Sequence, residues 1–525
     1  MKLYYLISLL GLINILQAEP PRIEVFDGIT DNQSVIFLDA LPQFTDETTE
    51  DDRLLRHMPM PIPHELQLLD LEKFETFPVS ENHTPHKVLL APPALSLSFE
   101  ALNDSLTTIP PDTQGTVGIN YVVTTLNDRV RVQTKTGLTL FTTSLASFSG
   151  IAGTGSLPFD PKIVFDPTSN RWIFTVLTNP GQPTSQILLA VSQTENPLGA
   201  WNRYTIKADP TATSSSGVWA DFPSLGFNSK WIVVQTNMFN IGTNGFNRSN
   251  VYVFNKASLY ANGPGTFRLF ALNGFGGTQT PAVTYDNNNP TLYLLQNWNG
   301  NASGRGYLLL YAINGPPGNE TLSTIGFASA AATWASSHPL INGGFAPQLG
   351  TTRRITNNDS RILGLVFRNG SLWAAQTAFL PATSPTRSAI QWWQIAPTGA
   401  VQQFGRIEDT SRSRFFAFPS IAVSIINNVL IGYSFFSPTI FASSGFSYRA
   451  ANDFPNTMRE TSVLRNGQDI YVKDFGSGRV RWGDYSSTVI DPNGQDFWTI
   501  QESADTRTAT GTTRWVTWWG RVLPT

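Results

Sequence analysis

"RWGDYSSTVIDPNGQDFW", residues 481–498, carries the pattern that decides the fold. A Gly and an Asp introduce a short alternating run, a Pro-Asn-Gly turn follows, and an aromatic pair opens the next run. Alternation with period two predicts a half-buried strand, and a turn of this kind between two such runs predicts an antiparallel hairpin. The stretch therefore predicts strands over 485–491 and 496–502.

The same pattern recurs along the chain at intervals of about 50 to 70 residues. The openings are "PDTQGTVGINYVV" from Pro111, "FDPKIVFDPTSNRWIF" from Phe159, "ADFPSLGFNSKWIVV" from Ala220, "QTPAVTYDNNNPTLYLL" from Gln279, "FAPQLGTTRRI" from Phe345, "FAFPSIAVSIINNVLIGY" from Phe416 and "GDYSSTVIDPNGQDFWTI" from Gly483. Three or four antiparallel strands at such a period are typical of a propeller blade. We therefore predict an all-β fold, a seven-bladed β-propeller, in preference to a pair of β-sandwich domains.

The last repeat contains only three clear strands, over 485–491, 496–502 and 513–521. The segment Pro93–Leu102 alternates just before the first repeat. A ring without an open sheet edge needs a fourth strand in the last blade. We predict that this N-terminal segment supplies it and closes the propeller.

The residues before the repeats have a different composition. Residues 1–18 hold Lys2, an apolar run and a terminal Ala18, which is typical of a secretory signal peptide. Residues 19–90 are rich in acids and prolines, and residues 19–108 hold 17 acidic and 5 basic side chains. They predict a mostly irregular acidic extension, either a flexible spacer or a cover for the more basic body, followed by a propeller over 91–525.

Export and the absence of cysteine limit the function classes. The chain has no Cys, which excludes disulfides, thiolate metal sites and a Cys nucleophile. A near-neutral body does not suggest nucleic-acid binding. No later stretch has the roughly 20 apolar residues of a spanning helix. We therefore expect a secreted or cell-surface protein without a transmembrane segment after signal cleavage.

Several motifs resemble an uncharacterised family of secreted bacterial β-propeller proteins. The resemblance rests on PPDTxGxVG in "PPDTQGTVGINYVV", on "FDPKIVFDPTSNRWIF", and on RWGDYS in "RWGDYSSTVIDPNGQDFWTIQE". It spans about Pro110 to the C-terminus and leaves out the extension. It implies a propeller and export, and it implies no particular activity.

Four acids mark the starts of repeats: Asp112, Asp160, Asp221 and Asp484. We expect them at equivalent blade positions, around one mouth of the central channel. Crowded carboxylates raise one another's pKa and can serve as a general acid and base, or they can hold Ca²⁺ together with carbonyl groups. The structural alternative is that each Asp caps its own blade. No other metal site and no other cofactor is expected.

A second set of candidates could bind a ligand. Trp219, Trp298 and Trp334 lie in polar, Gly- or Ser-rich stretches, where aromatic rings can stack on sugars. The alternative is that they fill gaps between blades. Arg449, Arg481 and Tyr485, together with Glu502, could form a sialidase-like site that clamps a carboxylate. The aspartate-box turn of that fold is absent, and pairing of Arg481 with nearby acids is the simpler expectation.

These candidates leave three functions open. The first is an exported recognition platform for glycan or extracellular protein ligands. The second is a glycoside hydrolase or lyase with an acidic site at the channel mouth. The third is a structural surface protein without a pocket.

Overall fold

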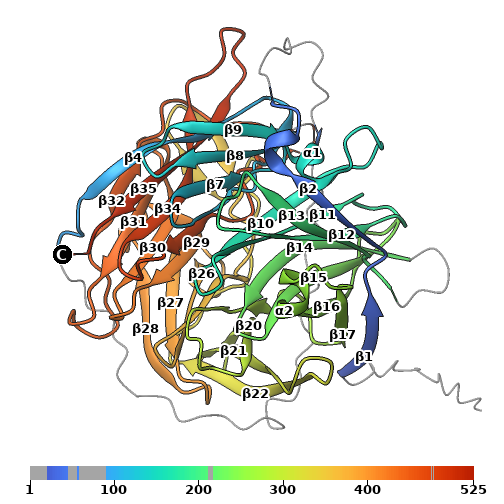
Figure 1. Cartoon of the computed structure of the whole chain (residues 1–525). Coiled ribbons are helices and arrows are strands. Elements are labelled where there is room, and N and C mark those ends of the chain that lie inside the picture. The colour runs from blue at the N-terminus through green and yellow to red at the C-terminus, as the bar shows by residue number, and fades with distance from the viewer. Residues whose placement is uncertain are drawn as a thin grey trace, which may run out of the picture.

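The computed structural model describes residues 21–44, 56–57, 90–210, 217–474, 476 and 478–524. The expected signal peptide and most of the acidic extension lie outside these residues. Within them the fold is all-β, with strands arranged as a β-propeller (Figure 1). Two short helices, α1 (Leu145–Ser149) and α2 (Lys256–Tyr260), and one 3-10 turn (Leu38–Ala40) join them. None of the described helices has the length and hydropathy needed to cross a bilayer.

Five separate sheets of four or five antiparallel strands form blades. The first contains β6 (Gln114–Val117), β7 (Tyr121–Thr125), β8 (Arg129–Thr134) and β9 (Thr139–Ser144). The second contains β10 (Pro158–Asp166), β11 (Arg171–Thr178), β12 (Gln186–Ser192), β13 (Ala200–Lys207) and β2 (Asn32–Phe37). The third contains β18 (Thr280–Pro281), β20 (Leu292–Ala302), β21 (Arg305–Asn314) and β22 (Thr321–Ala330).

The two remaining separate blades come from the C-terminal part of the chain. One contains β29 (Phe415–Val423), β30 (Val429–Ser437), β31 (Ile440–Arg449) and β32 (Ser462–Arg465). The other contains β33 (Ser487–Ile490), β34 (Phe497–Asp505), β35 (Arg514–Val522) and β4 (Leu95–Asn103). The three strands predicted for the last repeat are therefore confirmed, with ends shifted by a few residues.

A sixth sheet has ten strands and corrects the prediction of seven separate blades. One half contains β14 (Val218–Phe227), β15 (Trp231–Asn240), β16 (Phe246–Asn255), β17 (Thr266–Asn273) and β1 (Arg22–Ile29). The other half contains β25 (Ile362–Arg368), β26 (Ser371–Leu380), β27 (Arg387–Ile395) and β28 (Val401–Ile407). The halves merge because the two-residue strand β19 (Val283–Thr284) pairs in parallel with Phe227 on one side and with Val366 on the other.

The innermost strands of the sheets surround one axis. They contact one another in the order β6, β10, β14, β18, β25, β29 and β33, and β33 in turn contacts β6. The sheets therefore form a closed ring, as a propeller requires.

The predicted closing strand is confirmed. β4 pairs antiparallel with β35, with Phe99 opposite Trp519, and Figure 1 shows the light-blue β4 beside the red β35. The buried Thr517 hydroxyl donates to the Leu102 carbonyl at 2.8 Å and accepts from the Leu102 N–H at 3.1 Å. Burial of Trp498 and Trp519 against Val117 and Val122 then joins the last blade to the first.

The sequence analysis missed two strands in the extension. "RIEVFDGI" forms β1 and pairs with β17, while "NQSVIF" forms β2 and pairs with β13. Each adds an outer strand to a blade, and Asp27 on β1 forms an ion pair with Arg268 at 2.8 Å. Apolar and polar residues alternate in both segments, which is a strand signal, but the acidic composition of the region obscured it. A third strand in the described part of the extension is Arg56–His57 (β3), which pairs with Thr108–Ile109 (β5).

The repeat start predicted at Phe345 is misplaced. "FAPQLGTTRRI" forms a separate hairpin of β23 (Ala346–Gln348) and β24 (Thr351–Ile355). The inner strand of this part of the ring is β25 instead, which begins after "NNDSR". The local likeness of "FAPQ" to "FAFPS" produced the error, because an insertion that carries its own aromatic-proline turn imitates a repeat start.

Candidate functional site

The inner strands begin with an unusual backbone feature that organises the hub. A residue with a left-handed φ lies shortly before the inner strand or within its first half in most repeats: Asp112 (51°), Asp160 (55°), Phe222 (50°), Thr278 (60°), Asn358 (56°) and Phe418 (57°). In β10, β14 and β29 the pairing register shifts at this point. Such a bulge bends the strand and re-aims the flanking side chains. It therefore decides which side chains point toward the axis.

The four aspartates at the repeat starts do not occupy equivalent positions in their blades, which corrects the prediction made from the sequence. Asp112 and Asp160 occupy the left-handed position itself. Asp221 stands one residue before Phe222, and Asp484 likewise precedes Tyr485 in "GDYSS". The two pairs of aspartates therefore stand at different positions relative to the bulge, and their side chains leave the backbone in different directions.

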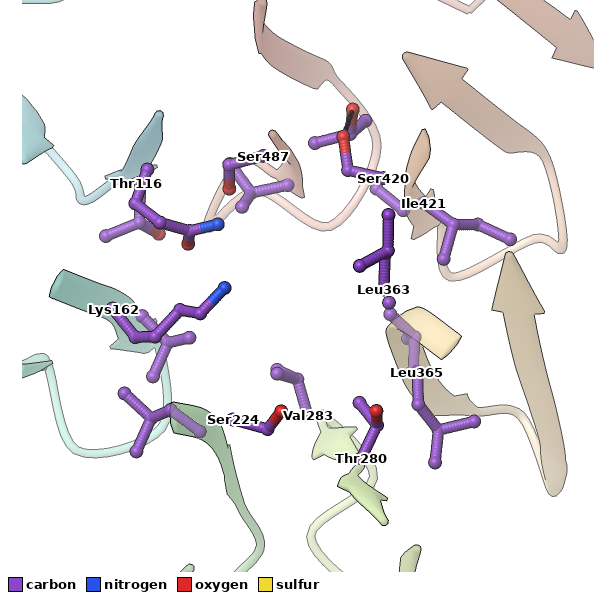
Figure 2. A pocket seen from close by; sticks show the side chains of 18 of the residues that line it. Thr116, Lys162, Ser224, Thr280, Val283, Leu363, Leu365, Ser420, Ile421 and Ser487 are labelled. Atoms are coloured by element: carbon purple, nitrogen blue, oxygen red, sulfur yellow. Dashed lines mark hydrogen bonds between the residues drawn. The ribbon is translucent and has the colours of Figure 1, made fainter. Parts of the chain in front are cut away.

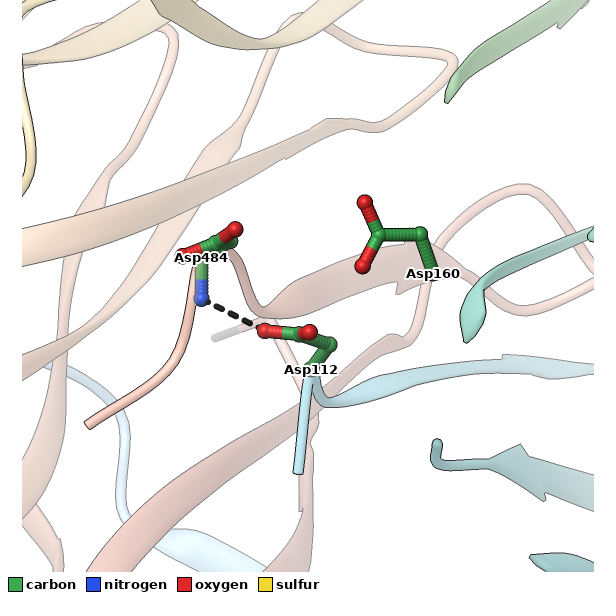
Figure 3. A group of neighbouring side chains, drawn as sticks. All are labelled: Asp112, Asp160 and Asp484. Carbon is green, nitrogen blue, oxygen red and sulfur yellow. Dashed lines mark hydrogen bonds between the residues drawn. The ribbon is translucent and has the colours of Figure 1, made fainter. Parts of the chain in front are cut away.

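The aspartates nevertheless converge at the hub. Asp112, Asp160 and Asp484 each place a carboxylate oxygen within 4.8 Å of the other two, as Figure 3 shows. Their side chains are buried, as is that of Asp221, with residue exposures of 0 to 6%. The expectation of acids at an open channel mouth is therefore not met, because the hub is sealed by its own side chains.

Hydrogen bonds across the hub account for two of these carboxylates. The Asp484 N–H donates to Asp112 Oδ1 at 2.9 Å, and the Asn127 amide donates to Asp112 Oδ2 at 2.6 Å (Figure 3 draws the first). The Phe222 N–H donates to Asp160 Oδ2 at 3.2 Å. Each acid therefore binds the backbone of a neighbouring repeat, instead of capping its own blade.

Other repeats use neutral side chains for the same purpose. Asn127 Oδ1 accepts from the Asp160 N–H at 2.7 Å, and Asn237 Oδ1 accepts from the Thr278 N–H at 2.7 Å. Thr377 Oγ1 accepts from the Phe418 N–H at 3.3 Å. A buried N–H at a left-handed turn needs an acceptor, and the preceding repeat provides one. Asp160, which accepts from the Phe222 N–H, belongs to this series, whereas Asp112 joins the first repeat to the last by accepting from the Asp484 N–H.

Burial dominates the electrostatics of the hub. It raises the pKa of Asp112 and of Asp160 well above the ordinary value, and the neighbouring carboxyl groups raise them further. Burial, with help from Asp484, raises the pKa of Asp221 to about 8. Burial therefore favours the neutral form of all three carboxyl groups, and Asp221, with a pKa of about 8, holds its proton at neutral pH.

The two hub arginines already have partners. Arg481 Nη2 lies 3.0 Å from Asp484 Oδ1. Arg361 binds Asp359 through two hydrogen bonds, at 2.7 and 2.6 Å. The predicted pairing of Arg481 with an acid at the blade start is therefore present.

A calcium site at this cluster stays a prediction. Asp112, Asp160 and Asp484 offer the oxygen ligands that Ca²⁺ takes. Both oxygens of Asp112 accept hydrogen bonds, however, and Arg481 lies against Asp484. A cation would have to displace these donors.

A cavity of about 100 Å³ lies on the axis, lined by the inner strands (Figure 2). A belt of polar side chains surrounds it at one level. Its members stand two residues after a left-handed residue: Gln114, Lys162, Ser224, Thr280 and Ser420. The bulge thus places the same repeat position on the cavity wall. Leu363, Leu365 and Ile421 supply apolar surface on the opposite side from Lys162, and Val283 lies between Ser224 and Thr280.

Hydroxyl groups connect part of the belt. Ser420 Oγ lies 2.8 Å from Ser486 Oγ and 2.7 Å from Thr488 Oγ1. The Gln114 amide donates to the Ser486 carbonyl at 3.0 Å. Hydroxyls can donate or accept, so this wall can adjust to a ligand with hydroxyl groups.

Lys162 is the exception in the belt. The residue is 8% exposed, and its Nζ makes no hydrogen bond or ion pair with any residue that the structure describes. The Nζ faces the Tyr485 ring, 2.8 Å from the ring centroid, and Figure 2 shows the side chain extending into the cavity. Burial lowers the pKa of Lys162 to about 7, although Asp160, Asp112 and Asp484 act in the opposite direction.

The tryptophans proposed for sugar stacking lie in the core, so this interpretation is corrected. Trp219, Trp298 and Trp334 are 0%, 7% and 1% exposed. Trp219 packs on Phe239, and the Trp334 ring meets Trp393 edge to face at 5.9 Å. Rings that are covered by other blades have no face free for a ligand, and they fill gaps between blades.

The other ligand-binding candidates are also buried. Arg449 is 3% exposed, and its guanidinium donates to the Ala450 and Asp453 carbonyls at 2.9 and 3.2 Å. It holds its own hairpin loop and does not join a cationic clamp. Tyr485 is 2% exposed and lies beneath Lys162.

Sequence reasoning missed Lys162, Asn127 and the rest of the belt. One signal was present: the third residue of "DPK", "FPS" and "FPS" at residues 160–162, 222–224 and 418–420 lines the cavity each time. The prolines mark the bulge, and the residue after each proline turns inward.

Comparisons with known proteins establish no family. No protein-family profile matches the chain, and no curated protein sequence matches it. The resemblance to a secreted bacterial propeller family therefore stays a prediction.

Solved structures resemble the chain only distantly. The phage phi92 endosialidase is 8% identical over 68% of this chain and 66% of its own, just under two thirds, with a TM-score of 0.37. Drosophila Semaphorin 1b, extracellular domains 1–2, is 7% identical over 82% of this chain and 87% of its own (TM-score 0.35). An endo-arabinase from Bacteroides thetaiotaomicron is 13% identical over 60% and 94% (TM-score 0.27). Likenesses of this size carry no information about ligand or reaction.

Proposed function

We propose that this protein is an exported, seven-bladed recognition platform that binds a glycan ligand in its axial cavity. Seven blades result when the ten-stranded sheet is counted as a five-stranded and a four-stranded blade joined by β19, each with its own inner strand, β14 or β25. Export rests on the signal-like first 18 residues. A glycan is favoured over an extracellular protein partner because the cavity is narrow and axial.

One observation carries the proposal: the polar belt on the cavity wall. Repeats that share little sequence each turn a polar side chain inward at the same level, in Gln114, Ser224, Thr280 and Ser420 among others. An axial cavity that served packing alone would be filled by apolar side chains. Convergent hydroxyl and amide groups opposite an aliphatic wall are the usual lining of a small-molecule site.

Hydrolysis has less support. A glycosidase needs two carboxyl groups about 5 to 10 Å apart that face an open cleft. The hub aspartates are buried, and both oxygens of Asp112 already accept hydrogen bonds, one from the Asp484 N–H and one from the Asn127 side-chain amide. The purely structural alternative leaves the polar belt without a role.

The test is to measure by calorimetry whether monosaccharides bind to the purified full-length protein. We expect Ser224→Leu to abolish binding, because Figure 2 shows Ser224 facing the cavity, where a leucine would fill the space. Ser323→Leu, at an exposed position on β22, is the matched control and should bind as the wild type does. Undiminished binding by Ser224→Leu would move the site away from the axis.

A further inference from the structure

The axial cavity contains a cation without a counter-ion. Arg481 pairs with Asp484 and Arg361 pairs with Asp359, whereas Lys162 Nζ has neither an ion-pair nor a hydrogen-bond partner in the described parts of the chain. Its main contact is the face of the Tyr485 ring. Burying an ammonium group without an oxygen partner is costly, and native proteins rarely do so.

The surroundings of Lys162 favour an anion as the missing partner. The acids that act on it are Asp160, Asp112 and Asp484, and the nearby base is Arg361. Burial raises the pKa of Asp112 and of Asp160 well above the ordinary carboxyl value, which favours their neutral forms. Arg481 pairs with Asp484 and Arg361 pairs with Asp359, and no carboxylate of the described residues lies within ion-pair distance of the Lys162 Nζ.

The polar belt defines the rest of the ligand. Hydroxyls of Ser224, Thr280 and Ser420 and the amide of Gln114 lie at the level of Lys162 around the cavity. These groups complement the hydroxyls of a sugar, and the aliphatic wall complements the C–H face of its ring. A single ammonium neutralises a carboxylate but not a phosphate dianion, which favours the former in a buried site.

We propose that the ligand is an acidic sugar whose carboxylate is bound by Lys162 while its hydroxyl groups meet the polar belt. This inference rests on the proposed function, because it names the class of glycan that occupies the same cavity. It assigns Lys162 as the residue that selects acidic over neutral sugars.

Calorimetry with four probes tests the inference: D-glucuronate and D-galacturonate, and their neutral parents D-glucose and D-galactose. With the full-length protein at pH 6.5, we expect an acid to bind at least about tenfold more tightly than its parent. In Lys162→Met the preference should vanish, while the neutral sugar keeps its affinity. Lys207→Met removes an exposed lysine and should change neither affinity. Thermal melts establish that both variants are folded.

The outcomes separate the two proposals. Equal affinity for acid and parent, or a preference for the acid that survives Lys162→Met, overturns the inference and leaves the recognition function standing. Tighter binding of D-glucose 6-phosphate than of glucuronate also overturns it. Failure of all sugars to bind overturns the proposed function itself.

Discussion

The hub and the cavity below it are built from the same strands, yet they use polar groups in opposite ways. At the hub, Asp112 is buried and both of its oxygens receive hydrogen bonds. Two residues beyond the next left-handed turn, Lys162 is also buried and its Nζ receives no such partner within the described residues. Buried polar groups that have their hydrogen-bond partners within the protein stabilise the fold. A buried polar group without such a partner is a place where a ligand can bind. The comparison teaches that burial by itself does not separate the two roles.

Removal of a saturated hub acid should have the largest effect. Asp112→Ala leaves the Asp484 N–H without its acceptor and removes one of the two acceptors of the Asn127 amide, which keeps the Pro110 carbonyl. We expect the free energy of unfolding to fall by about 3 kcal/mol. Urea titration measures it. Asp505→Ala, which removes a part-exposed ion pair with Arg465, should cost less than about 1 kcal/mol. Equal losses would show that the hub links are not special.

The second prediction concerns pH and Asp221. The unfolded chain ionises this carboxyl near its ordinary pKa of 3.8, while the folded protein keeps the proton up to about pH 8. Wild-type stability is therefore lost as pH rises across that interval. Asp221→Asn carries no proton to lose, so its stability relative to wild type should rise by about 2 kcal/mol between pH 5 and pH 8.5.

Thermal and urea unfolding at both pH values check this, with Asp409→Asn as the control. Bonds from Ser411 and Ser413, which outweigh a burial effect in the other direction, lower the pKa of Asp409 to about 2. It is therefore ionised in both states over this range, and its difference from wild type should stay constant. A pH-independent difference for Asp221→Asn would mean that the hub carboxyl is ionised at neutral pH.

The third prediction tests the unsaturated side of the comparison. Lys162 titrates near pH 7 in the folded protein and near 10.5 when unfolded, so wild-type stability is lost as pH falls through this interval. Lys162→Met should therefore be more stable than wild type by about 1.5 kcal/mol at pH 6, measured relative to pH 10. Lys207→Met should show no such trend. A loss of stability in Lys162→Met at pH 6 would reveal a partner for the ammonium.

The smallest effect is expected for a belt hydroxyl. Ser420→Ala removes the hydrogen bonds to Ser486 and Thr488, whose hydroxyls keep other partners in the Phe418 carbonyl and Thr499. We expect a loss of about 0.5 to 1 kcal/mol in urea unfolding. A loss as large as that of Asp112→Ala would place the belt among the structural elements and weaken the case for a ligand.

Much of the fold could be predicted, because strand periodicity and turns are local. The closing strand Pro93–Leu102 was found from the alternation of apolar and polar residues alone, because a strand that is buried on one face needs an apolar residue at every second position. The repeat at Phe345 was misplaced, because the turn in "FAPQ" is as local a signal as a true start. β25 has no Pro before its apolar run, and its Asp359 stands in "NNDSR", which does not resemble the other openings, so the strand was overlooked.

The candidate site was found only in part. Asp112, Asp160 and Asp484 do meet, as their place at repeat starts suggested. Their exposure, and that of Trp219 and Trp334, could not be predicted, because a Trp in a Gly- and Ser-rich stretch reads the same whether a neighbouring blade covers it or not. Lys162 lies in an ordinary-looking strand, and nothing near it in the sequence shows whether it has a partner.

By itself, the sequence determined that the chain forms repeated antiparallel sheets and that an early strand joins the last of them, because these properties depend on alternation and turn residues within short stretches. The tertiary structure decided which buried polar groups have hydrogen-bond partners within the protein. The acceptor for the Asp484 N–H lies 372 residues away along the chain, and the Lys162 amine is isolated only after the ring closes around it. Desolvation and pairing arise from segments that meet in space, so no local pattern can report them.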